Sequence, residues 1–421
     1  MSVFKLIPAG KDYLWGGRRL IDNYHKHGDG PILAETWELS CHPDGPSTIA
    51  DGAHQGQTLE QYLSTQGPAV LGRNCARFDH FPVLIKFIDA KQNLSIQVHP
   101  SDAYALSHEH SFGKTEMWYV LEAEPEAFLY YGFEHEISKE EFEQSIRNNT
   151  LTDKLHQVKV KAGDVFFIPS GTIHAIGAGI VIAEIQQNSN LTYRVYDYGR
   201  VGADGKPRQL HVDKALAVTT LAPAQVPEMH GHLGICDYFC VDKLELTDKL
   251  NLEATEASFV HLLAVRGAGT LRCGSETISW RKGDSLFIEA GSGAITVEGT
   301  GELLQTTIPA PQSVRIGIDV GGTDCKLGLV TPDHRIISKS SIPTESQKGA
   351  EDLVKRLAVA VTDLLQEQGL TLAQCTGIGI DIPGTCDRAQ GVVVYSNNIK
   401  WANVPIAALL AQELGTKLPI K

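Results

Sequence analysis

The chain has 421 residues, of which 42% are hydrophobic and 21% are charged, and its 50 acidic and 37 basic residues give a formal net charge of −13. This length predicts two or three domains. The composition is typical of a soluble globular protein, and no apolar run approaches the ~20 residues that cross a bilayer, which argues against a membrane protein. Because no Lys/Arg cluster is present, the sequence also argues against nucleic acid as a partner.

The start of the chain and its cysteines indicate a cellular compartment. Residues 1–5 lack the basic start, apolar core and small-residue cleavage site of a secretory signal. The eight cysteines are scattered and form no C-x-x-C motif, which is typical of free thiols in a reducing environment. We therefore expect a cytoplasmic protein.

From residue 35 to about residue 307, short apolar runs alternate with turn residues, a spacing that is typical of all-β proteins. The clearest runs are residues 81–88, 117–121, 164–169 and 180–185. Helical periodicity is confined to short pieces, which we interpret as surface helices decorating a barrel. These pieces are residues 58–66, 139–148 and 212–218.

Two turns in this part of the chain look alike, since residues 161–169 (KAGDVFFIP) and 281–288 (RKGDSLFI) both place Gly-Asp before an apolar strand. They predict two related barrels. Only the first turn is followed by a histidine, His174, whereas the second continues into residues 289–293 (EAGSG). We therefore expect the second barrel to be structural or to support a lid.

Residues that suit a metal ion occur at the ends of separate predicted strands. Gln97 and His99 are two positions apart, so on one strand they point to the same face. Glu116 opens the next strand, and His174 follows a Gly turn. Taken singly, each residue is more often structural, but the combination of imidazoles, carboxylate and amide suits a borderline divalent metal with one position left for water or substrate. Five other histidines lie in loops or a predicted helix and are left out, namely His25, His27, His42, His108 and His110.

Polar residues accompany this predicted metal site. Lys114 lies two positions before Glu116, and residues 184–197 form a polar stretch that contains Arg194. The stretch is interpreted either as a strand followed by an exposed loop or as a polar wall. In the second case, the planar guanidinium of Arg194 would suit a phosphate or a developing enediolate oxygen.

Beyond residues 308–312 (IPAPQ), a Pro-rich joint, the pattern changes to an α/β unit. We expect strands at 314–320, 326–330, 335–340 and 377–382 and a long amphipathic helix at 350–368. The first strand ends in a turn that suits phosphate, because glycines let a backbone approach closely and turn amides and a hydroxyl donate to oxygen. This predicted cofactor turn consists of Asp319, Gly321, Gly322 and Thr323.

Six stretches in the first three hundred residues together resemble one known family, the type I mannose-6-phosphate isomerases in their short bacterial form. They are LWGG at 14–17, ETWELS at 35–40, LSIQVHP at 94–100, GKTE at 113–116, PSGTIHA at 169–175 and QNS through YRVYD at 187–197. The resemblance implies cupin (jelly-roll) barrels and one zinc ion per catalytic domain, with ligands at Gln97, His99, Glu116 and His174 and an active-site arginine at Arg194.

The same resemblance implies interconversion of mannose 6-phosphate and fructose 6-phosphate through an enediol-like intermediate. The metal and Arg194 would stabilise the developing negative charge, and Lys114 would steer the phosphate or a sugar hydroxyl. Many family members carry Asp where this chain has Asn190, so a role for that carboxylate in proton handling does not carry over. The identity of the general base is left open.

The C-terminal unit resembles the ROK family of sugar kinases and repressors in three segments. They are residues 316–324, 377–385 and 395–401. The resemblance implies one part of an actin-like, ribonuclease-H-like ATPase fold, in which Asp319, Gly321, Gly322 and Thr323 would face ATP phosphates. Because the family's catalytic Asp follows beyond residue 421, we expect no kinase activity from this polypeptide, which also puts ATP binding in doubt.

Four segments follow from these patterns. They are a catalytic cupin domain (1–225), a second cupin-like β domain (226–308), a linker (309–313) and the N-terminal part of a ROK kinase lobe (314–421). We expect the C-terminal lobe to expose an apolar face through which it associates with a partner. Two other functions remain open, a non-catalytic sugar-sensing or scaffold protein and a different cupin enzyme such as an oxygenase or epimerase.

Overall fold

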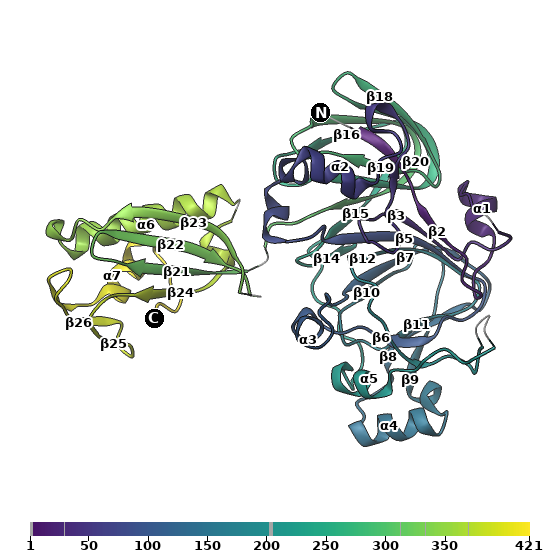
Figure 1. The fold of residues 1–421 in the computed structure, drawn as a ribbon, viewed down its shortest axis with the longest axis horizontal. Helices are drawn as coiled ribbons and strands as arrows, with labels where there is room; N and C mark the ends of the chain where they lie inside the picture. Colours follow the sequence, from purple (N-terminus) through teal and green to yellow (C-terminus); the bar gives the residue numbers. More distant parts are fainter. Residues whose placement is uncertain (1–2, 29, 202–204, 312, 333, 369) are drawn as a thin grey trace. The chain divides into compact units, whose positions relative to one another are not determined.

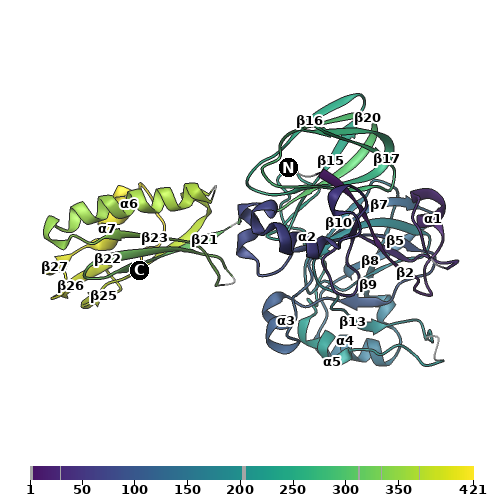
Figure 2. The same ribbon diagram turned by 45° about the horizontal axis from the view of Figure 1, so that its top comes forward.

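The computed structural model describes residues 3–28, 30–201, 205–311, 313–332, 334–368 and 370–421 (Figure 1 and Figure 2). Two compact units are present, one made of residues 1–72 and 80–308 and the other of residues 73–79 and 309–421. The first unit is mainly β and the second is α/β, which confirms both predicted fold classes. Among the described residues, no helix is long and apolar enough to span a membrane.

Two antiparallel sheets form the first barrel. The six-stranded sheet runs β10 (Val165–Ile168), β7 (Glu116–Ala123), β12 (Ile180–Gln187), β5 (Val83–Ala90), β3 (Glu35–Leu39) and β2 (Ala9–Lys11). The five-stranded sheet runs β13 (Tyr193–Tyr196), β6 (Ile96–Val98), β11 (His174–Ile176), β8 (Phe128–Phe133) and β9 (Leu155–Lys159). Side chains from both sheets share one core, in which Trp118 and Ile182 of the first sheet join Leu129 and Ile176 of the second.

Short helices lie on the surface of the β unit, and the one at residues 59–66 packs on the second barrel, where Tyr62 contacts Phe4. They are α1 (Arg19–Tyr24), α2 (Leu59–Gln66), α3 (Asp102–His108), α4 (Lys139–Arg147) and α5 (Val212–Val218). The start of α2 has a simple cause, because Thr58 and Gln61 exchange side-chain and backbone hydrogen bonds in a capping box. The predicted helices at 58–66, 139–148 and 212–218 are thereby confirmed.

The second barrel is one nine-stranded sheet. Its main path is β14 (Gly234–Ile235), β15 (Cys240–Leu246), β20 (Gly293–Thr307), β17 (Val260–Cys273), β19 (Ser285–Ile288), β1 (Val3–Ile7) and β4 (Thr48–Ile49), with β16 (Lys249–Ala254) on β20 and β18 (Glu276–Arg281) on β17. Apolar side chains such as Leu262, Trp280 and Leu303 form its core. Because β1 pairs with β19, the start of the chain completes this second sheet. The domain limits 1–225 and 226–308 stay predictions.

The second unit contains a four-stranded sheet in the order β23 (Ile336–Pro343), β22 (Asp324–Val330), β21 (Val314–Val320) and β24 (Cys375–Asp381). Helix α6 (Ala350–Glu367) packs its apolar side chains on one face of this sheet. A three-stranded sheet and a further helix follow, namely β25 (Thr385–Asp387), β26 (Val392–Ser396), β27 (Trp401–Val404) and α7 (Ile406–Glu413). The predicted four strands and long helix are confirmed within a few residues.

Candidate metal centre

Three strand ends of the first barrel bring the predicted ligands together. His99 directly follows β6, Glu116 is the first residue of β7 and His174 is the first residue of β11. The turn before His174 needs a glycine, because Gly171 has a φ of +86° and a side chain there would meet the carbonyl oxygen of Val218. Gly171 also donates its N–H to the His99 carbonyl oxygen at 2.8 Å, which ties the two histidine segments together.

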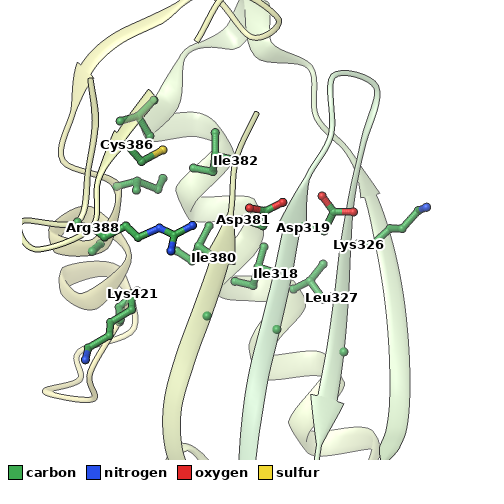
Figure 3. A pocket seen from close by; sticks show the side chains of 18 of the residues that line it. Ile318, Asp319, Lys326, Leu327, Ile380, Asp381, Ile382, Cys386, Arg388 and Lys421 are labelled. Carbon is green, nitrogen blue, oxygen red and sulfur yellow. The ribbon is translucent and has the colours of Figure 1, made fainter. Parts of the chain in front are cut away.

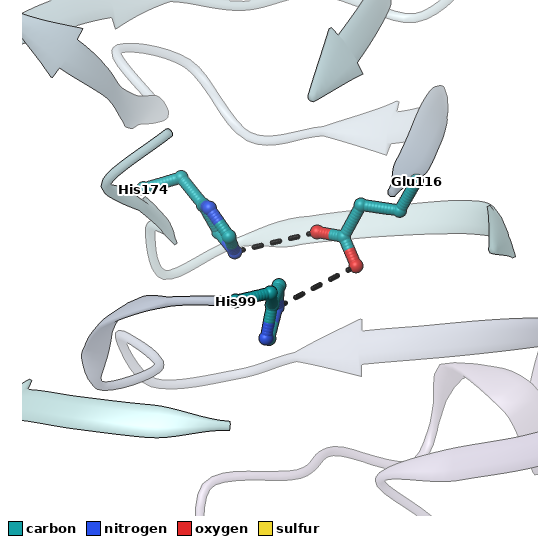
Figure 4. A group of neighbouring side chains, drawn as sticks. All are labelled: His99, Glu116 and His174. Carbon is teal, nitrogen blue, oxygen red and sulfur yellow. Dashed lines mark ion pairs between the residues drawn. The ribbon is translucent and has the colours of Figure 1, made fainter. Parts of the chain in front are cut away.

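The three side chains converge on one point (Figure 4). The Oε1 atom of Glu116 lies 3.3 Å from Nε2 of His174, and its Oε2 atom lies 3.7 Å from Nε2 of His99. All three residues are at most 1% exposed. Their ligand atoms lie within 4.8 Å of one another, which is a spacing that suits a shared metal ion.

Backbone carbonyls fix the protonation state of both rings. Nδ1 of His99 lies 2.9 Å from the carbonyl oxygen of Leu191, and Nδ1 of His174 lies 2.8 Å from that of Thr172. Since a carbonyl only accepts, each ring carries its proton on Nδ1 and presents a lone pair on Nε2. Burial lowers the pKa of His174 to about 4 and that of His99 well below its usual value, so both rings are neutral at pH 7.

This arrangement fits a divalent cation. Two ring lone pairs face the carboxyl group of Glu116, whose pKa is raised by burial, and neither Nε2 of His99 nor Oε1 of Glu116 has a hydrogen-bond partner among the described residues. Buried polar atoms without partners are costly, and a cation would satisfy them together. Two imidazoles and one carboxylate also form a donor set that zinc accepts in catalytic sites.

Gln97, the fourth predicted ligand, lies at the edge of this cluster. It is the register partner of His174 across β6 and β11, and its Nε2 atom lies 3.5 Å from Nε2 of His174. The amide therefore presents its nitrogen to the ring, and a half-turn of the amide group would present the oxygen instead. Its role as a ligand stays a prediction.

Beside the cluster lies a cavity of about 290 Å³, and both predicted catalytic residues line it. Nζ of Lys114 is 2.8 Å from Oε2 of Glu116, which connects the cavity to the metal cluster. Arg194, on β13, is held by Ser95 Oγ at 3.2 Å from its Nε and by the carbonyl oxygen of Gln209 at 3.2 Å from Nη1. Its guanidinium is therefore fixed at the cavity wall.

The sequence did not single out a buried charge network at the floor of this cavity. Glu184 lies 3.3 Å from Nζ of Lys86 and 3.6 Å from Nζ of Lys114, and Lys86 also pairs with Glu35 at 3.6 Å. Burial alone would raise the pKa of Glu184, but the two lysines outweigh it and lower the pKa to about 2. The available signal was a lysine and a glutamate in the middle of two otherwise apolar runs, residues 83–88 and 180–185.

Two further residues that sequence reasoning missed lie in or beside the cavity lining, namely Arg208 and Asp44. Arg208 lines the cavity and is held by Asp197, with Nε at 2.7 Å from Oδ2. Asn190, the position where the family often has Asp, donates from Nδ2 to Oδ2 of Asp44 at 3.2 Å. A carboxylate therefore still lies beside position 190, supplied by a different part of the chain.

In the second unit, the predicted phosphate turn lies at the end of β21. Asp319 lines a cavity of about 1030 Å³ and is the parallel register partner of Asp381 on β24 (Figure 3). Gly321, Gly322 and Thr323 form the turn that follows. A side chain at Gly321 would meet the carbonyl oxygen of Asp324, which explains a glycine there. Phosphate binding by these four residues stays a prediction.

The sequence and fold of this chain are similar to those of known proteins. Residues 3–132 match the family model for the phosphomannose isomerase type I catalytic domain, and residues 230–308 match the cupin domain of mannose-6-phosphate isomerase. The mannose-6-phosphate isomerase ManA of Bacillus subtilis is 36% identical over 310 residues, covering 70% of this chain and 96% of that protein. A crystal structure of the mannose 6-phosphate isomerase from Bacillus subtilis aligns with a TM-score of 0.67 at 34% identity, covering 73% of this chain and 99% of that chain.

The C-terminal residues have different relatives. Residues 315–421 match the ROK family model. A glucokinase of Thermotoga maritima is 34% identical over 109 residues, covering 26% of this chain, so the chain spans about a third (33%) of that kinase's length. Both resemblances seen in the sequence are thereby confirmed. The chain belongs to the type I mannose-6-phosphate isomerase family and carries a ROK-family segment at residues 315–421.

Proposed function

We propose that residues 1–308 interconvert mannose 6-phosphate and fructose 6-phosphate with a divalent metal held by His99, Glu116 and His174, and that zinc is the metal. The observation that carries the proposal is the convergence of this buried, lone-pair-rich cluster with a polar cavity. Gln97 and Lys114 connect the cluster to the cavity, because each lines the cavity and contacts a member of the cluster.

The charge of the cavity supports an anionic substrate. Although the chain carries a net charge of −13, the cavity lining holds four cationic side chains and two carboxylates. Local positive potential of this kind attracts and retains a phosphate. We assign the phosphate group to the mouth, where Arg208 and Arg194 offer planar guanidinium groups, and the reacting carbons to the floor beside Lys114. At about 290 Å³ the cavity suits a small polar molecule.

Aldose-ketose isomerisation moves a proton between neighbouring carbons and places negative charge on the oxygens they carry. A bound metal supplies Lewis acidity that polarises those oxygens. Lys114 and Arg194 approach the same space as hydrogen-bond donors, fixed in place before the reaction by Glu116, Ser95 and the carbonyl of Gln209. Fixed donors stabilise developing charge without reorganisation, which is the largest contribution that protein groups make in many enzymes.

Glu184 has a supporting role in this proposal. Because its pKa is about 2 in the presence of Lys86 and Lys114, it stays ionised and is a weak base at neutral pH. We infer that it orients the Lys114 ammonium toward the substrate. A Glu184→Gln variant would then keep its metal but lose activity, because the Lys114 ammonium would no longer be held in position.

The test is direct conversion of mannose 6-phosphate followed by proton NMR, with purified full-length chain and added zinc. We expect fructose 6-phosphate to appear, and no change in unphosphorylated mannose at the same concentration, because the guanidinium groups have no phosphate to bind. Turnover of mannose at a comparable rate would contradict the assigned phosphate site. No conversion of either sugar would contradict the proposed function.

The second unit receives no activity in this proposal. Its match covers about a third of a glucokinase, and the prediction that the polypeptide does not phosphorylate sugars stays a prediction. Incubation with ATP, magnesium and glucose or mannose tests it. Sugar phosphate formed above a protein-free blank would overturn it.

A further inference from the structure

A second cluster of metal-binding side chains lies in the other barrel. His232, Cys240 and Asp242 place one ligand atom each within 4.8 Å of one another. Cys240 and Asp242 are two positions apart on β15, so both side chains point to the same face of the strand. His232 reaches that face from the segment before β14, with Nδ1 at 2.7 Å from Oδ1 of Asp242.

The surroundings of this cluster favour a ligand rather than an isolated ion pair. Cys240 is 6% exposed, whereas the side chains of His232 and Asp242 are 34% and 32% exposed, so the cluster extends from a buried thiol to the surface. Across the sheet, Cys240 pairs with Thr307 and Asp242 pairs with Gln305, which adds a hydroxyl and an amide to the same face. A surface His–Asp pair alone would require none of these groups.

The donor chemistry selects a class of ion. A thiolate, an imidazole and a carboxylate together suit a borderline divalent transition metal, and they are poor ligands for calcium or magnesium, which prefer oxygen. Three protein donors leave a fourth tetrahedral position for water. We propose that His232, Cys240 and Asp242 form a second zinc site, separate from the cluster of the first barrel and without a part in catalysis.

The position of this site indicates what a bound ion would do. The β14–β15 hairpin lies against the catalytic barrel, since Gly234 approaches Met117 so closely that any side chain at 234 would collide with it. At the hairpin tip, Tyr238 donates from its hydroxyl to Asp102, which in turn accepts from the N–H of Gly113 at 2.6 Å. An ion that joins His232 to β15 would fix this hairpin. Its effect is therefore on the stability of the contact between the barrels.

Cobalt separates the two sites spectroscopically. Of the two clusters found among the described residues, the one in the first barrel contains no cysteine, so a thiolate-to-cobalt charge-transfer band would come from the proposed site. We expect metal-free full-length chain to take up two equivalents of Co²⁺ and to show that band in the near ultraviolet. A Cys240→Ser variant should bind one equivalent, lose the band and keep its isomerase activity, while a His174→Ala variant should bind one equivalent and keep the band.

Further variants keep the test decisive if Cys240→Ser folds poorly. His232→Ala and Asp242→Asn should each weaken cobalt binding at this site at least tenfold, because each removes one of three protein ligands. Exposed Cys386 provides the matched control, and Cys386→Ser should change neither stoichiometry nor band. Uptake of a single equivalent by the wild type without a thiolate band would overturn the proposal, as would a band that persists in Cys240→Ser. Failure of the isomerase assay would leave this test unaffected.

Discussion

The two barrels repeat one turn with different outcomes. In each, a glycine with positive φ, Gly163 at +92° and Gly283 at +94°, precedes an aspartate that caps the turn. Asp164 accepts from the N–H of Lys161 at 2.9 Å, and Asp284 accepts from that of Arg281 at 3.0 Å. A four-residue strand follows in both cases, β10 and β19.

The barrels diverge after that strand. Six residues beyond Ile168 the first barrel has His174, buried against Glu116, whereas six residues beyond Ile288 the second barrel has the exposed Ala294. Each barrel has an apolar core, and the first has in addition a polar cavity beside its metal cluster. The comparison teaches that the shared backbone supplies the framework and that a few substituted side chains supply the chemistry.

The largest effect is expected from removing the histidine that distinguishes the barrels. His174→Ala should lower kcat/KM by more than roughly a hundredfold, because loss of a ligand costs more than loss of a group that merely orients one. Metal content at the first site should fall with it, as mass spectrometry of the metal would show. Ala294→His is the matched control, and we expect it to add no metal and leave activity unchanged, because Ala294 is exposed and its cross-strand partner Glu253 is exposed too, so a histidine there would lack the buried carboxylate and second imidazole that accompany His174.

A smaller loss is expected at the lysine beside the metal cluster. Lys114→Met should lower kcat by roughly 10²–10³, the effect of removing one fixed charge-stabilising donor, while the metal stays bound. Steady-state kinetics and metal analysis of the same sample distinguish a loss of catalysis from a loss of the metal. Lys282→Met, in the repeated turn of the second barrel, should change kcat less than twofold. Equal losses in the two variants would mean that Lys114 acts only through stability.

The buried histidine of the second barrel should respond to pH through stability. Burial lowers the pKa of His261 from 6.5 to about 3, and its Nε2 atom lies 2.8 Å from Ser285 Oγ. Between those pH values the unfolded chain binds a proton that the folded chain does not, so the free energy of unfolding falls as pH falls, by up to about 1.4 kcal/mol per pH unit. Denaturant titrations of His261→Gln should give a shallower pH dependence in this window. An unchanged slope would contradict the buried neutral ring.

The smallest effects are expected at the repeated turn itself. Asp164→Ala and Asp284→Ala each remove one hydrogen bond to a backbone N–H, which should lower the free energy of unfolding by about 1 kcal/mol. Each aspartate also has a lysine partner, and the second loss should be the larger because the pair of Asp284 with Lys5 of β1, at 2.7 Å, is less exposed than the pair of Asp164 with Lys161, whose lysine is 83% exposed. Thermal unfolding of the two variants measures both losses of stability. Loss of activity in Asp164→Ala without loss of stability would show that the first turn does more than hold its strand.

Sequence patterns were sufficient wherever a local rule applied. The helix at 58–66 follows from its capping box, and the cluster of His99, Glu116 and His174 follows from polar residues at strand ends. The patterns were insufficient where partners come from distant segments. Lys86 and Glu184 lie in the middle of β5 and β12, and nothing local to either residue indicates that the register pairs them across the sheet.

The pairing of β1 with β19 and the contact between Asn190 and Asp44 have the same origin. Each joins residues more than a hundred positions apart, so sequence spacing carries no trace of it. The pairing of Lys86 with Glu184 therefore required the folded arrangement, whereas the convergence of His99, Glu116 and His174 could be predicted from the chain alone.

The most direct test of the account is a coupled assay that follows mannose 6-phosphate to fructose 6-phosphate before chelation, after chelation and after restoration of zinc. We expect activity to disappear when the metal is removed and to return when one equivalent is bound at His99, Glu116 and His174, in the wild type and in Cys240→Ser alike. Full activity in rigorously metal-free protein, or none after the metal is restored to a folded chain, would contradict it.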